Sequence, residues 1–374
     1  MITEVEVKNF RSLRDTKLSL GRLVVLIGPN GSGKSNLLDA IRVMHSFQIE
    51  RQEIGSVLGQ RGGYREVVWG GETAADITVS VNWREDSAPM TSLQTAVVEF
   101  GLGESADDVI IREEFLTSDG QSFRRTSGSA FSLEENGVSL ASGNVNQERS
   151  AAPDAERRLS SPNVLQSMRE WAFYRFDPVA MRQPQPVRKE YKINQSGQNL
   201  STVIHTLFSD GAPALGEIVD VLKACVPAVE KLSSPITDEG RTYVALKEKW
   251  VPMPVGSWGL SDGTLLALAL ATALMTPRPP TLIALEAPDT ELHPHVMETL
   301  AEMLTVASEK TQVIITTHSP YLLDFLPLEA FVVVEKRKGE TEFGPLKNRR
   351  DAQRVVKELG VGDAWVSGHL GGVP

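Results

Sequence analysis

The stretch that decides the fold lies near the start of the chain and reads Gly28-Pro29-Asn30-Gly31-Ser32-Gly33-Lys34-Ser35. It fits G-x-x-x-x-G-K-[ST], the Walker A pattern of a phosphate-binding loop. An apolar run at residues 23–27, typical of a buried strand, precedes the loop, and apolar residues at helical spacing follow it. Because strand, glycine-rich turn and helix occur in the order such a loop needs, we expect this stretch to bind the phosphates of a nucleotide.

Each residue type in this loop has a physical task. Glycines let backbone N–H groups converge on phosphate oxygens, and the N-terminus of the following helix adds a positive dipole. Lys34 offers a cation, and the Ser35 hydroxyl is a magnesium ligand in loops of this kind. We expect ATP and Mg²⁺ as cofactors. The residues expected to bind the nucleotide are Asn30, Gly31, Ser32, Gly33, Lys34, Ser35 and Asn36.

A second apolar run, at residues 281–285, ends on the carboxylate of Glu286. A hydrophobic strand that ends on a carboxylate is the pattern of a Walker B element, which lies on the metal side of a phosphate site. We therefore expect Ser35 and Glu286 to be the metal ligands.

Composition excludes several other classes. The longest apolar run, residues 265–275, is too short to cross a bilayer, and the N-terminus lacks the pattern of a signal peptide, so we expect a cytoplasmic protein without membrane contact. Cys225 is the only cysteine, which rules out an intrachain disulfide and favours a buried structural thiol. A net charge of −10 argues against indiscriminate binding to nucleic acid.

The order of the elements predicts an α/β fold with three parts. Residues 1–100 are expected to form an N-terminal lobe with the phosphate loop, and residues 101–255 an insertion or lid. Residues 256–374 alternate helices and apolar strands, which predicts a C-terminal lobe with a largely parallel sheet. Short β-rich segments over residues 76–140 predict an antiparallel β-subdomain. The polar, serine-rich stretch 117–161 is expected to include a mobile loop.

The middle of the chain is less regular. Residues 163–255 predict helices at 203–208 and 215–226 but sustain no apolar heptad, so we expect a compact, mainly helical insertion and not a coiled coil. From residue 256 onward the pattern predicts helices at 264–275 and 294–308 and a buried strand at 312–317.

These motifs together resemble the ABC-type P-loop ATPases of the SMC and RecF branch. The opening Val5-Glu6-Val7-Lys8-Asn9-Phe10-Arg11-Ser12-Leu13 resembles the N-terminal hairpin of that branch, and the run Asp289 to His293-Pro294 resembles its D-loop. The resemblance covers residues 1–45 and 256–335. It is greatest to the compact ATPases without a coiled coil, such as the ATPase halves of overcoming-lysogenization-type nucleases and related phage-defence systems.

The resemblance assigns further roles. Leu260-Ser261-Asp262-Gly263-Thr264 resembles the LSGGQ signature, in which the serine and glycine contact the γ-phosphate held by a second subunit. It therefore implies a homodimer or higher oligomer closed around ATP, with Ser261 and Gly263 at the nucleotide. A plain helix N-cap is the alternative for Ser261. His318 matches the switch histidine that hydrogen-bonds the γ-phosphate.

One position departs from the family pattern. Glu286 takes the first Walker B carboxylate, but Ala287 stands where the family has its catalytic glutamate, so the expected catalytic positions are Glu286, Ala287 and His318. A methyl group cannot accept a proton, so hydrolysis should be very slow. An engineered Glu-to-Ala replacement and a natural loss of activity both remain open. The resemblance also suggests that Arg11 approaches the nucleotide, with a plain surface arginine on the hairpin as the alternative, and that Gln52 or Gln60 is the Q-loop glutamine.

The function implied is an ATP-dependent switch or clamp in DNA repair or anti-phage defence that engages DNA or an effector protein. The alternative is a non-hydrolysing regulatory scaffold that holds a separate effector, and a transporter subunit is disfavoured. Because only about 55 residues follow His318, too few for a further domain of about 100 residues, we expect no fused nuclease. Two basic groups are candidate contacts for nucleic acid or a partner: residues 336–338, and Lys347, Arg349, Arg350 and Arg354.

Overall fold

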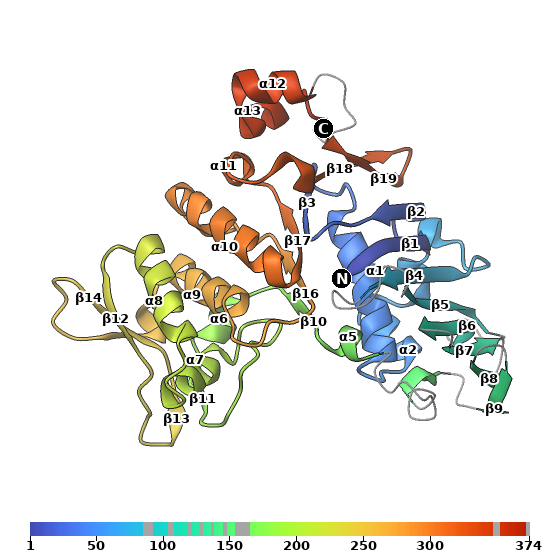
Figure 1. Cartoon of the computed structure of the whole chain (residues 1–374), viewed down its shortest axis with the longest axis horizontal. Coiled ribbons are helices and arrows are strands. Elements are labelled where there is room, and N and C mark those ends of the chain that lie inside the picture. Colours follow the sequence, from blue (N-terminus) through green and yellow to red (C-terminus); the bar gives the residue numbers. More distant parts are fainter. Residues whose placement is uncertain are drawn as a thin grey trace.

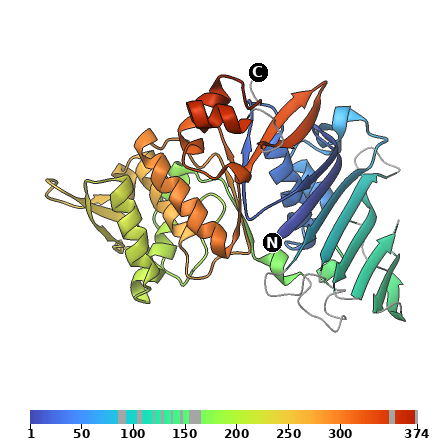
Figure 2. The same cartoon turned by 45° about the horizontal axis from the view of Figure 1, so that its top comes forward.

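Two large β-sheets, two small ones and the helices packed against them make up the described part of the protein (Figures 1 and 2). The computed structural model describes residues 1–84, 93–103, 108–118, 121–126, 130–135, 138–144, 148–153, 165–346 and 352–371. Its order of strands and helices is that of an α/β protein, as the sequence predicts.

The central sheet has six strands in the order β10-β16-β17-β3-β18-β19. The first five run parallel, and β19 pairs with β18 as an antiparallel edge strand. The strands are β3 (Leu23–Ile27), β10 (Trp171–Tyr174), β16 (Leu282–Glu286), β17 (Gln312–Thr317), β18 (Phe331–Arg337) and β19 (Glu340–Pro345). The strand predicted at 312–317 is confirmed. The sequence did not predict β10, because four residues are too few to show a periodicity.

The second sheet is antiparallel and has eight strands in the order β2-β1-β4-β5-β6-β7-β8-β9. Its strands are β1 (Ile2–Phe10), β2 (Leu13–Ser19), β4 (Ile77–Trp83), β5 (Gln94–Leu102), β6 (Val109–Ser118), β7 (Gln121–Thr126), β8 (Ala130–Glu135) and β9 (Val138–Asn144). The predicted antiparallel subdomain is confirmed. The division placed at residue 100 falls inside β5, because this sheet continues without interruption from the N-terminal strands into β6.

Part of the polar stretch 117–161 is folded into β7, β8 and β9. A strand at the outer part of a sheet needs few apolar residues, and here Phe123 and Leu133 are fully buried while β9 is largely exposed. Low hydrophobicity is therefore compatible with strands in this part of the sheet. Residues 145–147 and 154–161 of the same stretch lie outside the described residues.

Helix α1 (Lys34–Gln48) lies between the two sheets. One face of the central sheet, with Val24 and Leu26, shares a core with Leu37 and Ile41 of α1 and with the antiparallel sheet. The alternate residues of the same strands face a second core formed by helices at 200–209, 214–225, 262–274, 297–310, 320–323 and 361–366. Central parallel strands are buried on both faces in this way, which explains their continuous apolar runs.

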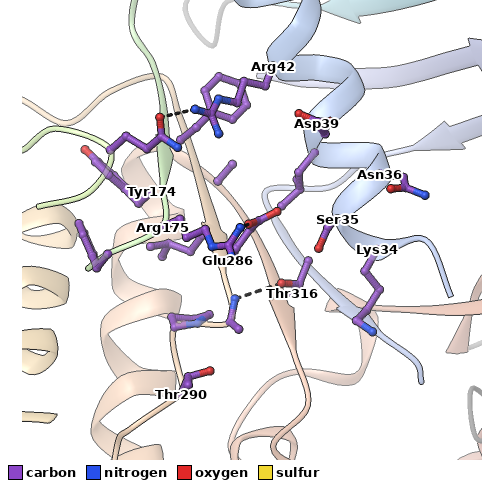
Figure 3. Close-up of a pocket in the computed structure, with 18 of the residues that line it drawn as sticks. Lys34, Ser35, Asn36, Asp39, Arg42, Tyr174, Arg175, Glu286, Thr290 and Thr316 are labelled. Carbon is purple, nitrogen blue, oxygen red and sulfur yellow. Dashed lines mark hydrogen bonds and ion pairs between the residues drawn. The ribbon is translucent and has the colours of Figure 1, made fainter. Parts of the chain in front are cut away.

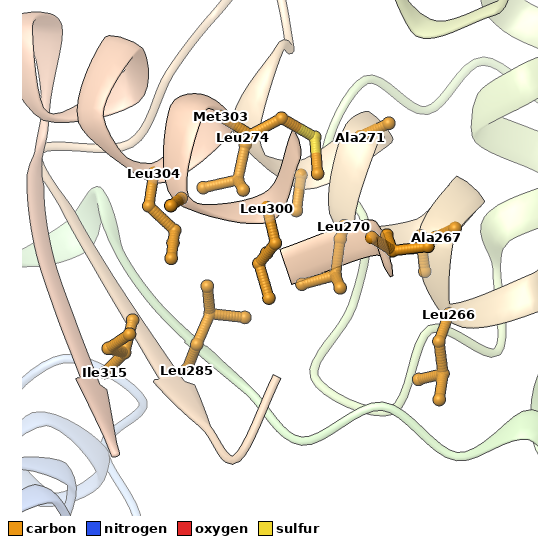
Figure 4. Close-up of a cluster of buried hydrophobic side chains, with 14 of the residues drawn as sticks. Leu266, Ala267, Leu270, Ala271, Leu274, Leu285, Leu300, Met303, Leu304 and Ile315 are labelled. Carbon is orange, nitrogen blue, oxygen red and sulfur yellow. The ribbon is translucent and has the colours of Figure 1, made fainter. Parts of the chain in front are cut away.

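The helical lobe on the other face contains α7 (Leu200–Ser209), α8 (Ala214–Cys225), α9 (Asp262–Leu274) and α10 (Met297–Lys310). Side chains of α9 and α10 meet Leu285 and Ile315 of the central sheet (Figure 4). Two small sheets, β11-β13 and β12-β14-β15, complete this lobe. They comprise β11 (Gln185–Pro186), β12 (Val229–Ser233), β13 (Arg241–Thr242), β14 (Ala245–Glu248) and β15 (Val255–Gly256).

Short helices connect these parts. They are α2 (Ile54–Gly59), α3 (Tyr64–Val67), η1 (Trp69–Gly71), α5 (Gln166–Arg169), α6 (Pro178–Met181), η2 (Ser257–Gly259), η3 (Pro294–Val296), α11 (Pro320–Leu323), η4 (Leu328–Ala330), α12 (Ala352–Leu359) and α13 (Val361–Val366). No helix within the described ranges has the length and apolarity needed to cross a membrane.

Candidate nucleotide site

The loop between β3 and α1 is held in shape by the edge of the central sheet. Gly33 has φ 108°, and a Cβ there would lie 2.1 Å from the Thr341 hydroxyl oxygen of β19, so only glycine fits. The Thr341 hydroxyl donates a 2.7 Å hydrogen bond to the Ser32 carbonyl. Gly31 has φ 74°, and no atom would lie within 4 Å of a Cβ there, so this part of the loop faces open space. The side chain of Ser32, within the same loop, is buried.

Lys34 is the first residue of α1, and its ammonium group lies over the loop. Its Nζ donates to the carbonyl oxygens of Gly28 at 2.8 Å and Pro29 at 2.9 Å. The side chain is buried, and this burial lowers its pKa to about 8. The Lys34 ammonium group therefore has two uncharged partners, both backbone carbonyl oxygens, which it can exchange for a phosphate oxygen.

Asn36 and Arg11 connect α1 to the N-terminal hairpin. The Asn36 amide donates to the Ser12 hydroxyl at 2.7 Å, and Arg11 forms an ion pair with Asp39 at 3.1 Å. Arg11 has φ 50°, and it borders the same cavity as the phosphate loop. The approach of Arg11 expected from the resemblance is thus geometrically open.

A cavity of about 780 Å³ separates α1 from the ends of β10, β16 and β17. This volume is within the range of about 300–1,000 Å³ that small-molecule sites occupy. The cavity brings together most of the residues predicted from the sequence (Figure 3). The predicted residues on its walls are Asn30, Gly31, Gly33, Lys34, Ser35, Asn36, Glu286, Ala287 and His318.

Strand register explains why residues so distant in sequence meet here. Glu286 at the end of β16 pairs with Thr316 of β17, and Thr317 pairs with Ile27 at the end of β3. The carboxyl ends of parallel strands meet at one edge of a sheet, where ligands bind in folds of this kind. Glu286 therefore faces the phosphate loop across the cavity and forms a 3.8 Å ion pair with Arg175.

Ala287 turns the chain away from β16 into the next loop. Its backbone has φ 45°, in the left-handed region, and its N–H points at the Thr316 carbonyl oxygen at 3.0 Å and at the Thr316 hydroxyl oxygen at 3.1 Å. Ala287 borders the cavity but carries only a methyl group there.

His318 and Asp289 form a second ionisable pair beside the cavity. Burial lowers the pKa of His318, the nearby Lys34 ammonium lowers it further, and Asp289 opposes both effects. Burial raises the pKa of Asp289, against a hydrogen bond from Thr317. One Asp289 oxygen, Oδ1, is buried and makes no hydrogen bond to any residue that the structure describes. At neutral pH the imidazole is neutral and can donate or accept a hydrogen bond.

The signature-like loop does not border this cavity. The Ser261 hydroxyl caps α9, accepting from the Thr264 N–H at 3.2 Å, and a Cβ on Gly263 would lie 2.7 Å from the Glu291 carbonyl oxygen. Both residues therefore have a role within their own chain, because Ser261 satisfies a helix terminus and Gly263 permits close packing.

The structure also places the two glutamine candidates, the single cysteine and part of the basic groups. Gln60 borders the cavity, whereas the Gln52 amide donates to Glu50 at 2.9 Å outside it. Burial raises the thiol pKa of Cys225 to about 11, which fits a structural role. Lys336 borders a second cavity, beside the N-terminal hairpin, and Arg354 lies on α12. The remaining basic candidates, Lys347, Arg349 and Arg350, lie outside the described residues.

Sequence reasoning missed other residues on the cavity wall. Arg42 lies seven residues after Ser35 on α1, a helical spacing that offered a signal. Arg61, Arg175 and Gln195 come from loops and show no pattern of their own. Arg42, Arg61 and Arg175, together with Lys34 and Arg11, make this cavity rich in cations, as a triphosphate site requires.

The cavity also suits a magnesium ion bound together with a triphosphate. No cluster of three or more His, Cys, Asp or Glu side chains able to hold a metal occurs within the described ranges. Mg²⁺ in phosphate-transfer sites needs only one or two protein oxygens, because phosphates and water complete its shell. The Ser35 hydroxyl and the Glu286 carboxylate, both on the cavity wall, are oxygen donors of this kind.

Comparisons with known proteins agree with this geometry. Residues 1–84 match the family model "AAA ATPase domain", and residues 175–324 match "AAA domain, putative AbiEii toxin, Type IV TA system". The first range contains the phosphate loop and the second contains Glu286 and His318. The OLD nuclease of Thermus scotoductus is 24% identical over 370 residues, which cover 91% of this chain. The two matched models describe ATPase domains, and the chain resembles the ABC-type P-loop ATPases of the SMC- and RecF-like branch.

Other relatives of the ATPase support the same fold. A chromosome partition protein Smc of Methanococcus voltae is 49% identical over 41 residues, or 11% of this chain and 3% of that protein. A solved Smc head bound to the C-winged helix domain of ScpA has a TM-score of 0.59 at 14% identity, covering 92% of this chain and 97% of the other. A Pyrococcus furiosus Smc head bound to the C-terminal domain of ScpA has a TM-score of 0.52 at 13% identity, covering 96% and 98%. The ATPase spans 63% of the length of the OLD nuclease.

Proposed function

We propose that this ATPase binds ATP with Mg²⁺ in the 780 Å³ cavity and acts as an ATP-dependent switch that assembles into dimers. One observation carries the proposal: the phosphate loop borders a single cavity with Glu286 and His318, although both follow Lys34 by more than 250 positions in the sequence. Residues 30–36 would surround the phosphates, and Lys34 would supply the cation. Ser35 and Glu286 would bind the metal, which neutralises charge on the phosphates.

We further propose that hydrolysis is very slow. Attack on the γ-phosphate requires a group that orients the water and accepts its proton, and the methyl group of Ala287 does neither. His318, neutral at physiological pH, would then hold the γ-phosphate by a hydrogen bond. The expected outcome is a long-lived ATP-bound state.

We favour an effector protein or DNA as the partner of the switch, in DNA repair or anti-phage defence, for a cytoplasmic protein. The support is similarity: one relative is an OLD nuclease, and two solved Smc heads carry a bound domain of ScpA. Within this scheme residues 1–100 and 256–374 would form the nucleotide-binding lobes, and residues 101–255 an insertion or lid.

A second candidate is a non-hydrolysing scaffold that holds a separate effector protein. The methyl group of Ala287 favours it, because a head that retains ATP is suited to hold a partner in one arrangement. Retention of ATP without phosphate release, in a complex that stays assembled for hours, would favour the scaffold. Repeated turnover stimulated by DNA would favour the clamp.

The deciding experiment is calorimetry of Mg–ATP binding to the wild-type chain and to Lys34→Ala. We expect Lys34→Ala to lose measurable binding, because the ammonium group is the cation nearest the loop carbonyls. Lys357→Ala, which removes a cation from α12, serves as a matched control and should bind like the wild type. Equal affinity in the Lys34→Ala variant would refute the assignment of this cavity.

A further inference from the structure

Arg175 stands beside the Walker B carboxylate because of strand register. β10 and β16 run parallel, with Tyr174 opposite Leu285, so Arg175, the first residue after β10, lies beside Glu286, the last residue of β16. The Arg175 guanidinium lies 3.8 Å from the Glu286 carboxylate, and its side chain is 77% exposed. The guanidinium is thus close enough to pair with Glu286 and free enough to move away.

The segment that follows Arg175 leads directly to the signature-like loop. Asp177 caps the single turn of α6 by accepting from the Val179 N–H at 2.9 Å. Beyond that turn, the Arg182 guanidinium donates to the Leu260 carbonyl at 2.8 Å and forms an ion pair with Asp262 at 2.5 Å.

A third bond closes the connection. The Ser257 hydroxyl donates to the Arg182 carbonyl at 2.8 Å. Eight residues, 175–182, therefore link the carboxylate at the end of β16 to the N-terminus of α9. We call residues 175–182 the strap.

We propose that Arg175 is the internal counter-ion of Glu286 and that the strap conveys its release to the signature-like loop. This inference rests on the proposed function, since it assumes that Glu286 takes a metal. A carboxylate paired with a guanidinium has less capacity for a second cation, so Arg175 has to withdraw before Glu286 serves as a metal ligand. Its withdrawal would pull on the strap and shift residues 257–262. Arg175 is in this sense a positioning residue, acting through Glu286 and Arg182.

The first test measures how much Mg²⁺ strengthens ATP binding. For each variant, calorimetry gives the ratio of the ATP affinity in Mg²⁺ to the ATP affinity in EDTA. The binding of Mg²⁺ to free ATP affects this ratio equally in every variant, so it does not affect the comparison between variants. We expect Arg175→Gln to raise this ratio by about two- to fivefold, the range for loss of an exposed ion pair. Arg175→Lys, which keeps the charge, should stay near the wild type. Arg188→Gln is the matched control, because Arg188 is also exposed and pairs with one carboxylate, that of Glu190.

The second test uses hydrogen exchange of the nucleotide-free proteins. If the strap is anchored through Arg175, amides at 175–182 and 257–264 should exchange faster in Arg175→Gln than in Arg188→Gln. Adding Mg–ATP should then change exchange at 257–264 less in Arg175→Gln than in the wild type. This readout does not depend on catalysis.

The two tests distinguish the role of Arg175, the role of the strap and the proposed function. An unchanged affinity ratio and unchanged exchange in Arg175→Gln would overturn the inference, and a changed ratio with unchanged exchange would overturn the role of the strap. If the wild type bound no ATP under either condition, the proposed function would fail. The exchange of the nucleotide-free variants would still decide whether Arg175 anchors the strap.

Discussion

At the scale of single residues, Ala287 has two unusual features: a left-handed backbone conformation, and a methyl group where a catalytic carboxylate is expected. Its φ of 45° lies in a region that residues with a Cβ seldom adopt, and its N–H is oriented by Thr316. Alanine and glutamate both carry a Cβ, so both bear a similar conformational cost at this position. Residue 287 can therefore be exchanged without adding new backbone strain.

Installing the carboxylate is the direct test of slow hydrolysis. We expect Ala287→Glu to raise the rate of phosphate release by about 10²- to 10⁴-fold, the usual contribution of a positioned general base. The gain should disappear when Lys34→Ala is added, as a phosphate-release assay would show. Rapid hydrolysis by the unaltered chain would mean that another residue serves as the base.

Asp289 predicts a pH dependence of stability. Because burial raises its pKa, the folded state holds this proton more tightly than the unfolded state. The stability that this proton adds is fully present below the ordinary pKa of the carboxyl and is lost as pH rises through the folded-state pKa.

The matched variant is Asp289→Asn, which cannot ionise. The free energy of unfolding of the wild type, relative to this variant, should increase as pH falls from 7 toward 4. Urea denaturation of both proteins across this range measures the difference. A constant difference would show that the carboxyl does not titrate abnormally.

At the scale of elements, one side chain of β17 fastens the two sheets together. The Gln312 amide donates to the carbonyls of Ile2 and Gly21, each at 2.7 Å, and its oxygen accepts from the Ile2 N–H at 2.7 Å. Gln312 is 1% exposed, so water does not compete for these bonds. The N-terminal strand is thereby attached to the central sheet next to β3.

Replacing this glutamine should loosen the attachment. We expect Gln312→Leu to lower the free energy of unfolding by about 2–4 kcal/mol, because it leaves buried backbone groups without partners. Gln52→Leu, at a half-buried glutamine whose side-chain amide donates to the exposed carboxylate of Glu50, should cost less than about 1 kcal/mol. Denaturant melts of the two variants make the comparison, and equal losses would show that the Gln312 bonds contribute little.

At the scale of the whole molecule, the phosphate loop and the start of α9 belong to different parts of the chain. The cavity borders the first but not Ser261 or Gly263, so any contact of Ser261 with the nucleotide requires a second copy. Capping of α9 by Ser261 offers a local explanation for the same residue. The two roles can be separated, because aspartate caps a helix as well as serine does but repels a phosphate.

Ser261→Asp is therefore the informative variant for assembly. We expect it to keep the thermal stability of the wild type and to lose ATP-dependent dimerisation, measured by small-angle scattering with and without Mg–ATP. Ser261→Asn, which caps without a charge, is the control and should retain more of the ATP effect. Dimerisation of Ser261→Asp equal to that of the wild type would leave capping as the only role of Ser261.

The sequence by itself determined the local parts of this protein. The loop at 28–35, the strand at 312–317 and the carboxylate at the end of β16 were all predicted, because each depends on neighbouring residues: glycines that permit a turn, or apolar runs long enough for a buried strand. The meeting of most predicted site residues on one cavity wall follows from these local parts, since neighbouring parallel strands end at one edge of a sheet.

Only the tertiary structure decided the rest. β10 joins the central sheet with too short a run to be seen in the sequence, and its register alone puts Arg175 beside Glu286. The choice of Gln60 over Gln52 at the cavity, and the packing of Gly263 against Glu291, likewise depend on loops that meet across the fold. Patterns of period 2 or 3.6 report which face of an element is buried, but not which distant segment covers it, because that pairing is set by register and packing over the whole chain.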